Sequence, residues 1–128
     1  MSEHDRYQQA AVRAICLLQQ KVRWKPDKDK QHLSKRKAMG LLPDDATVDD
    51  YNALIRAVLN GANSLVYRYP FGERDYYAVC GEMRGVAWLL IFSEDGIMET
   101  AFPPDDLADY MRKRGFVPLG KLGEMVHE

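Results

Sequence analysis

The chain has 128 residues, of which 46% are hydrophobic and 29% are charged, and its formal net charge is −1 at pH 7. This length favours one domain with its own hydrophobic core, and charges of mixed sign at this level do not indicate disorder. The near-zero net charge excludes a protein coated with basic side chains for non-specific DNA binding, although it leaves room for a local basic patch.

The first part of the chain, about residues 5–61, is predicted to be helical. Over residues 5–23, apolar side chains recur at three- and four-residue steps, which indicates an amphipathic helix. Pro26 ends that pattern, because a proline pushes the preceding residue out of the α region. The next segment, KDKQHLSKRKAMG, is expected to form a short helix with Gly40 just past its end.

A third helix is predicted from the segment TVDDYNALIRAVLNG. Thr47 is expected to cap its N-terminus, since Asp50 follows three residues later in the arrangement of a capping box. An apolar stripe runs along the segment, and Gly61 supplies a stop signal.

Residues 64–102 predict four strands, SLVYRY, DYYAVC, VAWLLIF and IMETAF, joined by the turns PFGER, GEMRG and SEDG. Because the connections are short, these strands can pair only as a mostly antiparallel meander. The unbroken apolar run VAWLLIF is typical of a central strand that is covered on both faces.

A C-terminal helix is predicted over about residues 104–114, where acids come first and basic residues last, an order that complements the helix dipole. The tail FVPLGKLGEMVHE is expected to add an edge strand or a packed loop. We therefore predict a single α+β domain spanning residues 1–128. Its N-terminal helices pack against one side of a four-stranded, mostly antiparallel β-meander, which a C-terminal helix follows.

Other features of the sequence predict a cytoplasmic protein without metal or cofactor. Cys16 and Cys80 lie among apolar neighbours and form no CxxC pair or Cys/His cluster, so we expect two reduced thiols. The N-terminal segment is polar and resembles no signal peptide. The longest apolar run is far shorter than the roughly 20 residues that a membrane span needs, so no membrane partner is expected.

Basic charge is concentrated between residues 21 and 40. This segment holds eight lysines and arginines but only two aspartates, a local excess of six positive charges. The compensating acids lie in the later segments DDATVDD and PPDDLAD. Such asymmetry fits a surface that faces a polyanion, an electrostatic clamp between parts of the protein, or a solvated helix face.

A histidine lies within this basic segment. On a helix, Lys28, His32 and Arg36 would project from one side, at steps of four residues. An arginine can hold a phosphate by two parallel hydrogen bonds, and nearby cations lower the pKa of a histidine, which favours the neutral form of a general base. The alternative is an exposed histidine on a polar helix, with no chemical role.

The predicted strands carry a second set of candidates. Arg68 lies near the end of the first strand, and Tyr76 and Tyr77 lie in the second strand, one on each face. Aromatic side chains on a sheet can stack nucleobases, but tyrosine is also a common strand and core residue.

Alternation along IMETAF predicts that Met98 and Thr100 share one face, while Ile97, Glu99 and Ala101 share the other. A threonine among inward-facing residues needs a hydrogen-bond partner, or it offers its hydroxyl group in a cleft.

The order HLSKR, VDDYNALIRAVLNG, YRYPFGERDYYAVCG, VAWLLIFSEDG and METAFPP resembles small domains of the barnase–EndoU–colicin–RelE-like ribonuclease superfamily over about residues 28–103. The resemblance implies helices ahead of a four-stranded antiparallel sheet, an early H-x-x-x-R and a strand with a threonine-containing TAF-like end. It also implies RNA cleavage without metal, by attack of the 2′-hydroxyl on the adjacent phosphate, in a domain of toxin or mobile-element type.

The same resemblance assigns catalytic roles to three residues. His32 would act as the base or acid, Arg36 would stabilise charge on the phosphate, and Thr100 would orient the phosphate or a neighbouring side chain. The residues that would bind substrate, by charge or by stacking, are Lys28, Lys35, Arg68, Tyr76 and Tyr77.

A non-enzymatic interaction or regulatory module is the alternative function. In that case the basic segment 21–40 would dock an acidic protein partner, and the acidic segments would suit self-association into a homo-oligomer. A nuclease needs His32, Arg36 and Thr100 to converge on one open cleft, whereas a docking module needs only an exposed basic face. An RNA-cleaving toxin would also need a protein inhibitor in its host.

Overall fold

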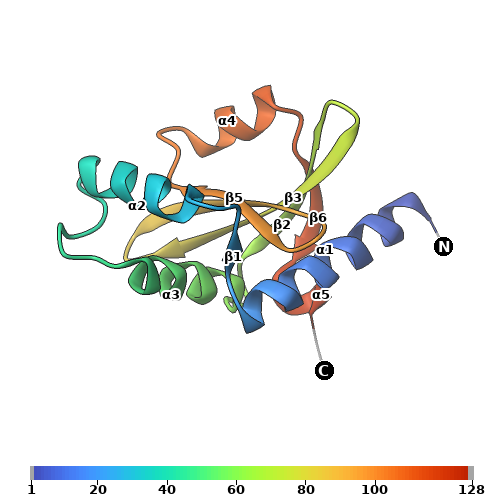
Figure 1. The fold of residues 1–128 in the computed structure, drawn as a ribbon. Helices are drawn as coiled ribbons and strands as arrows, with labels where there is room; N and C mark the ends of the chain where they lie inside the picture. Colours follow the sequence, from blue (N-terminus) through green and yellow to red (C-terminus); the bar gives the residue numbers. More distant parts are fainter. Residues whose placement is uncertain (1, 127–128) are drawn as a thin grey trace.

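The structure is a computed structural model that describes residues 2–126, so Met1, His127 and Glu128 lie outside it. The helices are α1 (Glu3–Gln20), α2 (Lys28–Ala38), α3 (Val48–Leu59), α4 (Leu107–Lys113) and α5 (Leu122–Met125). The strands are β1 (Arg23–Trp24), β2 (Leu65–Phe71), β3 (Arg74–Met83), β4 (Val86–Ser93), β5 (Ile97–Phe102) and β6 (Val117–Lys121). The predicted α+β class is confirmed (Figure 1).

The strands form one sheet in the order β1-β5-β4-β3-β2-β6. The predicted meander is confirmed, because β2, β3, β4 and β5 pair with their chain neighbours in antiparallel fashion. The predicted four strands are part of a six-stranded sheet. β6 is the edge strand expected from the tail and pairs antiparallel with β2, whereas the parallel strand β1 beside β5 was not predicted. β1 has only two residues, too few to give an alternating pattern in the sequence.

Several local signals are confirmed. Thr47 caps α3 in a capping box with Asp50, and Gly40 follows α2 with a φ of 76°. The segment GEMRG is not a five-residue loop, because β3 continues to Met83. The hairpin turns at Arg84 and Gly85, whose φ angles are 54° and 79°, as in the tight two-residue turns that match strand twist.

One face of the sheet is closed by helices. Along β4, Trp88, Leu90 and Phe92 point to this face and are no more than 3% exposed. They form one cluster with buried residues of α1 and α3, including Ile15 and Ile55. Since full burial of such a side chain is worth about 1.5–3 kcal/mol, this closed face is the main source of stability.

Within residues 2–126, α4 is the helix that packs on the opposite face, so the predicted C-terminal helix lies across the sheet from α1 and α3 (Figure 1). Ala78, Cys80, Leu89 and Ile91 are buried on this face. Side chains of α4 and of the segment after it pack over them, among them Tyr110. The fold is therefore three-layered where α4 lies and two-layered elsewhere.

Candidate functional site at the β5 edge

A β-bulge in β5 decides where the candidate residues point. Ile91 of β4 pairs with Thr100, but the next residue, Phe92, pairs with Met98, so Glu99 is an extra residue in the ladder. Thr100 therefore shares the α4 face with Ile91, while Met98 shares the closed face with Phe92. The prediction that Met98 and Thr100 share a face is wrong, because a bulge interrupts the two-residue alternation.

Arg36 lies at the edge of β5 and is only 5% exposed. Its Nε donates to the carbonyl oxygen of Ala101 at 2.8 Å, and its Nη2 lies 3.4 Å from Thr100 Oγ1. The Tyr51 hydroxyl donates to the same carbonyl at 2.5 Å. Since β1 pairs with only the first two residues of β5, these side chains of α2 and α3 stand in for a strand at the rest of the edge.

The remaining contacts of Arg36 also hold it in place. Nη1 lies 3.2 Å from the sulfur of Met39, and the guanidinium carbon lies 5.5 Å from the centre of the Phe102 ring. So little of Arg36 is exposed that it contacts a bound phosphate only if it moves. Arg36 can therefore influence the open surface through its positive charge and through its contact with Thr100.

His32 lies one helical turn before Arg36 and is partly buried. Its ring centre is 5.6 Å from that of Trp24, which in turn stacks on Tyr51 at 5.5 Å. Burial lowers the pKa of His32, and the charges of Arg36, Lys35 and Lys28 lower it further, against a small opposing hydrogen-bond effect of the Glu99 backbone. His32 is therefore held in its neutral form near pH 7.

The two imidazole nitrogens of His32 differ. Nδ1 is buried and has no hydrogen-bond partner among residues 2–126. An unpaired buried nitrogen costs free energy, and in a functional site it is a candidate proton acceptor. His32 thus has the protonation state of a general base, although its ring is partly covered.

An open depression of about 300 Å³ lies on the α4 face beside Thr100. Its lining residues all belong to strands and none belongs to α4: Tyr69, Phe71, Tyr76, Ile91, Glu99 and Thr100. The bulge explains why Glu99 and Thr100, which are consecutive, both line it. Of the three predicted catalytic residues, Thr100 lines the depression, whereas His32 and Arg36 do not.

Two cations lie beside this depression. Lys25 Nζ is 2.8 Å from Glu99 Oε1, and this pairing raises the pKa of Lys25. The Arg74 guanidinium lies over the ring of Tyr76, 5.3 Å from its centre. Lys25 belongs to the basic segment 21–40, so its ion pair with Glu99 links that segment to the depression.

The other predicted binding residues do not all join this site. Lys28 and Lys35 are exposed on α2. Arg68 is on the closed face, where it bonds Asp75 at 2.9 Å and lies over the ring of Tyr7 at 4.0 Å.

The two neighbouring tyrosines face opposite sides, as predicted. Tyr76 lines the depression, whereas Tyr77 is 1% exposed in the core, and its burial raises its pKa to about 12. Tyr77 therefore has no free ring face for a ligand.

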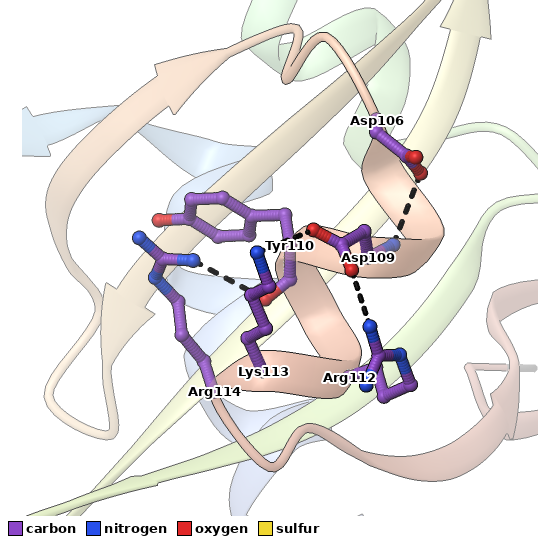
Figure 2. Close-up of polar contacts among 6 residues, drawn as sticks. All are labelled: Asp106, Asp109, Tyr110, Arg112, Lys113 and Arg114. Atoms are coloured by element: carbon purple, nitrogen blue, oxygen red, sulfur yellow. Dashed lines mark hydrogen bonds and ion pairs between the residues drawn. The ribbon is translucent and has the colours of Figure 1, made fainter.

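Helix α4 covers another part of the same sheet face. Asp106 caps its N-terminus, and Asp109 accepts from Arg112 and Lys113 (Figure 2). Arg114 folds back over the ring of Tyr110, 3.6 Å from its centre. These contacts pair the cations of this segment with partners in the same segment, whereas Lys25 and Arg74 contact residues that line the depression.

Sequence reasoning missed two residues of the site, Phe71 and Arg74. A signal was present, because Tyr67, Tyr69 and Phe71 recur at two-residue steps and so share one strand face. An aromatic stripe that continues to the end of an exposed hairpin exceeds what a core requires.

Two larger hollows lie elsewhere. One, of about 660 Å³, lies between α1 and α5, and the other, of about 440 Å³, lies between the loop after α2, α3 and the β3–β4 hairpin. Neither is lined by a predicted site residue. We therefore choose the depression beside Thr100 as the candidate site because of its lining residues and not because of its volume.

Metal binding has no support within residues 2–126, where no three His, Cys, Asp or Glu side chains gather as a ligand set. None of the helices in the same range has the length and apolar character needed to cross a bilayer. Comparison of the chain with protein-family models, curated proteins and solved structures finds no match.

Proposed function

We propose that this chain is an RNA-binding domain that cleaves RNA without a metal ion at the β5 edge. The observation that carries the proposal is the position of Thr100, which touches Arg36 of α2 and also lines the open depression. The basic helix and the aromatic surface therefore meet at one residue. Cationic side chains beside exposed aromatic rings are the usual combination for binding a single strand.

The chemistry requires a base, a phosphate contact and an acid. A base takes the proton of the 2′-hydroxyl, whose oxygen attacks the phosphorus, and the bond from phosphorus to the 5′-oxygen breaks. The 5′-oxygen takes a proton from a solvent water, which serves as the acid, and the base later releases its own proton to solvent. The products are a 2′,3′-cyclic phosphate and a 5′-hydroxyl. The neutral His32 is assigned the role of base, because its lowered pKa keeps it able to accept a proton.

The phosphate contacts are assigned to Thr100, which is half-buried and lines the depression, and to two exposed lysines. The Thr100 hydroxyl donates to a phosphate oxygen, and Lys28 and Lys35 supply charge from the outer side of α2. Arg36 is a positioning residue that orients Thr100 and adds positive charge from behind it. Such preorganised charge is commonly the largest catalytic contribution.

The experiment is incubation of the purified protein with single-stranded RNA in the presence of a chelator. We expect cleavage with 2′,3′-cyclic phosphate ends, and no cleavage of DNA of the same sequence, which lacks the nucleophile. His32→Gln should lower the rate about 100-fold or more, the usual contribution of a positioned base. His4→Gln, at an exposed histidine of α1, is the matched control.

Other outcomes would contradict the proposal in part or in full. Binding without cleavage would remove the catalytic role and leave the RNA-binding role. Equal rates for wild type and His32→Gln would remove His32 as the base.

A protein that neither binds nor cuts RNA would favour the second candidate, a module that docks an acidic protein. That candidate is favoured by the exposed lysines of the basic segment, such as Lys28, Lys30 and Lys35.

A further inference from the structure

We propose that the depression beside Thr100 is a subsite for one unpaired nucleobase, which stacks on the exposed ring of Phe71 and the half-buried ring of Tyr76. The inference rests on the proposed RNA function and deepens it by naming single-stranded RNA as the substrate class. It assigns a binding role to Phe71, Arg74 and Lys25, three residues outside the catalytic set.

The aromatic geometry supports a stacking site. Tyr69, Phe71 and Tyr76 form a triangle with ring centres 5.9, 6.3 and 6.5 Å apart. Tyr69 is fixed from behind, because it stacks on Phe116 at 4.5 Å. Phe71 is 63% exposed, the largest exposure among the large hydrophobic residues of the described chain. Tyr69 is thus held in place by Phe116, whereas Phe71 is open to solvent.

The charges around the triangle fit a nucleic-acid strand. Arg74 lies over Tyr76 on the hairpin side, and Lys25 lies on the β5 side, so a cation flanks each side of the depression. Glu99 is the acid on the wall, and it is already paired with Lys25. A base inserted between these cations would place its two flanking phosphates near them, since phosphate contacts supply most non-specific affinity.

The shape of the depression selects single strands. In an A-form duplex the base faces are covered by their neighbours, and the deep major groove does not admit side chains. The rings of Phe71 and Tyr76 can reach a base face only when that base is unstacked. Duplex RNA of the same sequence should therefore lack this contact.

The test measures binding of a short 2′-O-methyl RNA, which has no free 2′-hydroxyl and is not cleaved. Affinity is compared for the single strand, its duplex and a strand with one abasic site. Phe71→Ala and Tyr76→Ala should each weaken single-strand binding about 5- to 150-fold, the range for loss of one base–aromatic stack. Leu17→Ala, at an exposed hydrophobic residue of α1, on the other side of the sheet, is the matched control.

Three results would overturn the subsite. These are unchanged single-strand affinity in both aromatic variants, equal affinity of wild type for single strand and duplex, and a wild-type dimer that Phe71→Ala separates while RNA affinity stays the same. The last result would assign Phe71 to a contact between copies of this chain. If wild type binds no oligonucleotide, the subsite and the RNA function fail together.

The catalytic and binding proposals separate in this design. Tight binding that depends on Phe71, without cleavage of ordinary RNA, would retain the subsite and reject the catalysis. Cleavage that is indifferent to Phe71 and Tyr76 would retain the catalysis and reject the subsite.

Discussion

The two faces of the sheet are both rich in apolar side chains, but only one is closed. The helices α1 and α3 have 18 and 12 residues, about 27 and 18 Å of helix. The opposite face carries α4, whose seven residues span about 10 Å, over a sheet of six strands that is about 24 Å wide. The comparison shows that hydrophobic pattern alone does not separate core from surface, because the length of the covering helix decides it.

Two phenylalanines, one on each face, give the most direct test of this difference between the faces. Phe92 is fully buried on the closed face and Phe71 is 63% exposed on the other. Phe92→Ala should lower the free energy of unfolding by about 3–5 kcal/mol, because it leaves a cavity in the core. Phe71→Ala should change it by no more than about 0.5 kcal/mol, as for other surface positions. Urea denaturation of both variants checks the difference.

A large loss of stability in Phe71→Ala would contradict the distinction between the two faces. It would mean that the aromatic triangle is a second core and not an open surface. The same variant then could not serve as a binding probe, and Tyr76→Ala would have to replace it.

Substitution of Arg36, at the β5 edge of the sheet, should lower the free energy of unfolding by an amount between those for the two phenylalanines. Arg36 donates to the carbonyl oxygen of Ala101, which also accepts from the Tyr51 hydroxyl. Its guanidinium also lies over the ring of Phe102 on the α4 face. Arg36→Ala should lower the free energy of unfolding by about 2–3 kcal/mol, since it removes a buried charged hydrogen bond. Lys35→Ala, the exposed neighbour, should cost little by the same denaturation measurement.

A double-mutant cycle with Tyr51→Phe sharpens this prediction. Arg36 and Tyr51 donate to one carbonyl oxygen, so removing both leaves Ala101 without either donor. We expect the two effects to be non-additive by about 0.5 kcal/mol or more. Additive effects, or an Arg36→Ala variant as stable as wild type, would show that Arg36 is not needed at the edge.

Much of the fold could be predicted from the sequence, because most elements carry their own local signal. Thr47 and Gly40 mark helix ends through side-chain capping and a positive φ, and both are used as predicted. β5 was bounded correctly as a strand, yet its bulge at Glu99 was not foreseen. A bulge is set by pairing with a neighbouring strand, so a single strand's sequence does not reveal it.

The candidate site was predictable in its parts but not in its geometry. The four-residue spacing of His32 and Arg36 did place both at the β5 edge, and Arg36 does lie near Thr100. The burial of Arg36 was not predictable, because it depends on β1 ending after two residues and leaving a carbonyl to be satisfied. The sequence could not show which of Tyr76 and Tyr77 is free to bind a ligand, because it did not show which sheet face α1 and α3 would close.

The smallest expected effect concerns His32, which lies on the same edge against the Trp24 ring of the closed-face cluster. Its pKa is lowered in the folded protein, first by burial and then by Arg36, Lys35 and Lys28. The unfolded chain therefore binds a proton at higher pH than the folded one. Its stabilising contribution is complete above about pH 6.5, the ordinary histidine value, and is lost as the pH falls toward the folded-state pKa.

His32→Gln removes this titration while keeping a polar side chain. The wild-type free energy of unfolding should therefore fall more steeply than that of the variant as the pH drops below about 6.5, with the two curves parallel above it. Urea midpoints measured across this range give the comparison, and His4→Gln controls for loss of an exposed imidazole. Parallel curves throughout would mean that His32 is solvated like a surface histidine. It would then lack the bias toward the neutral form on which its role as a base depends.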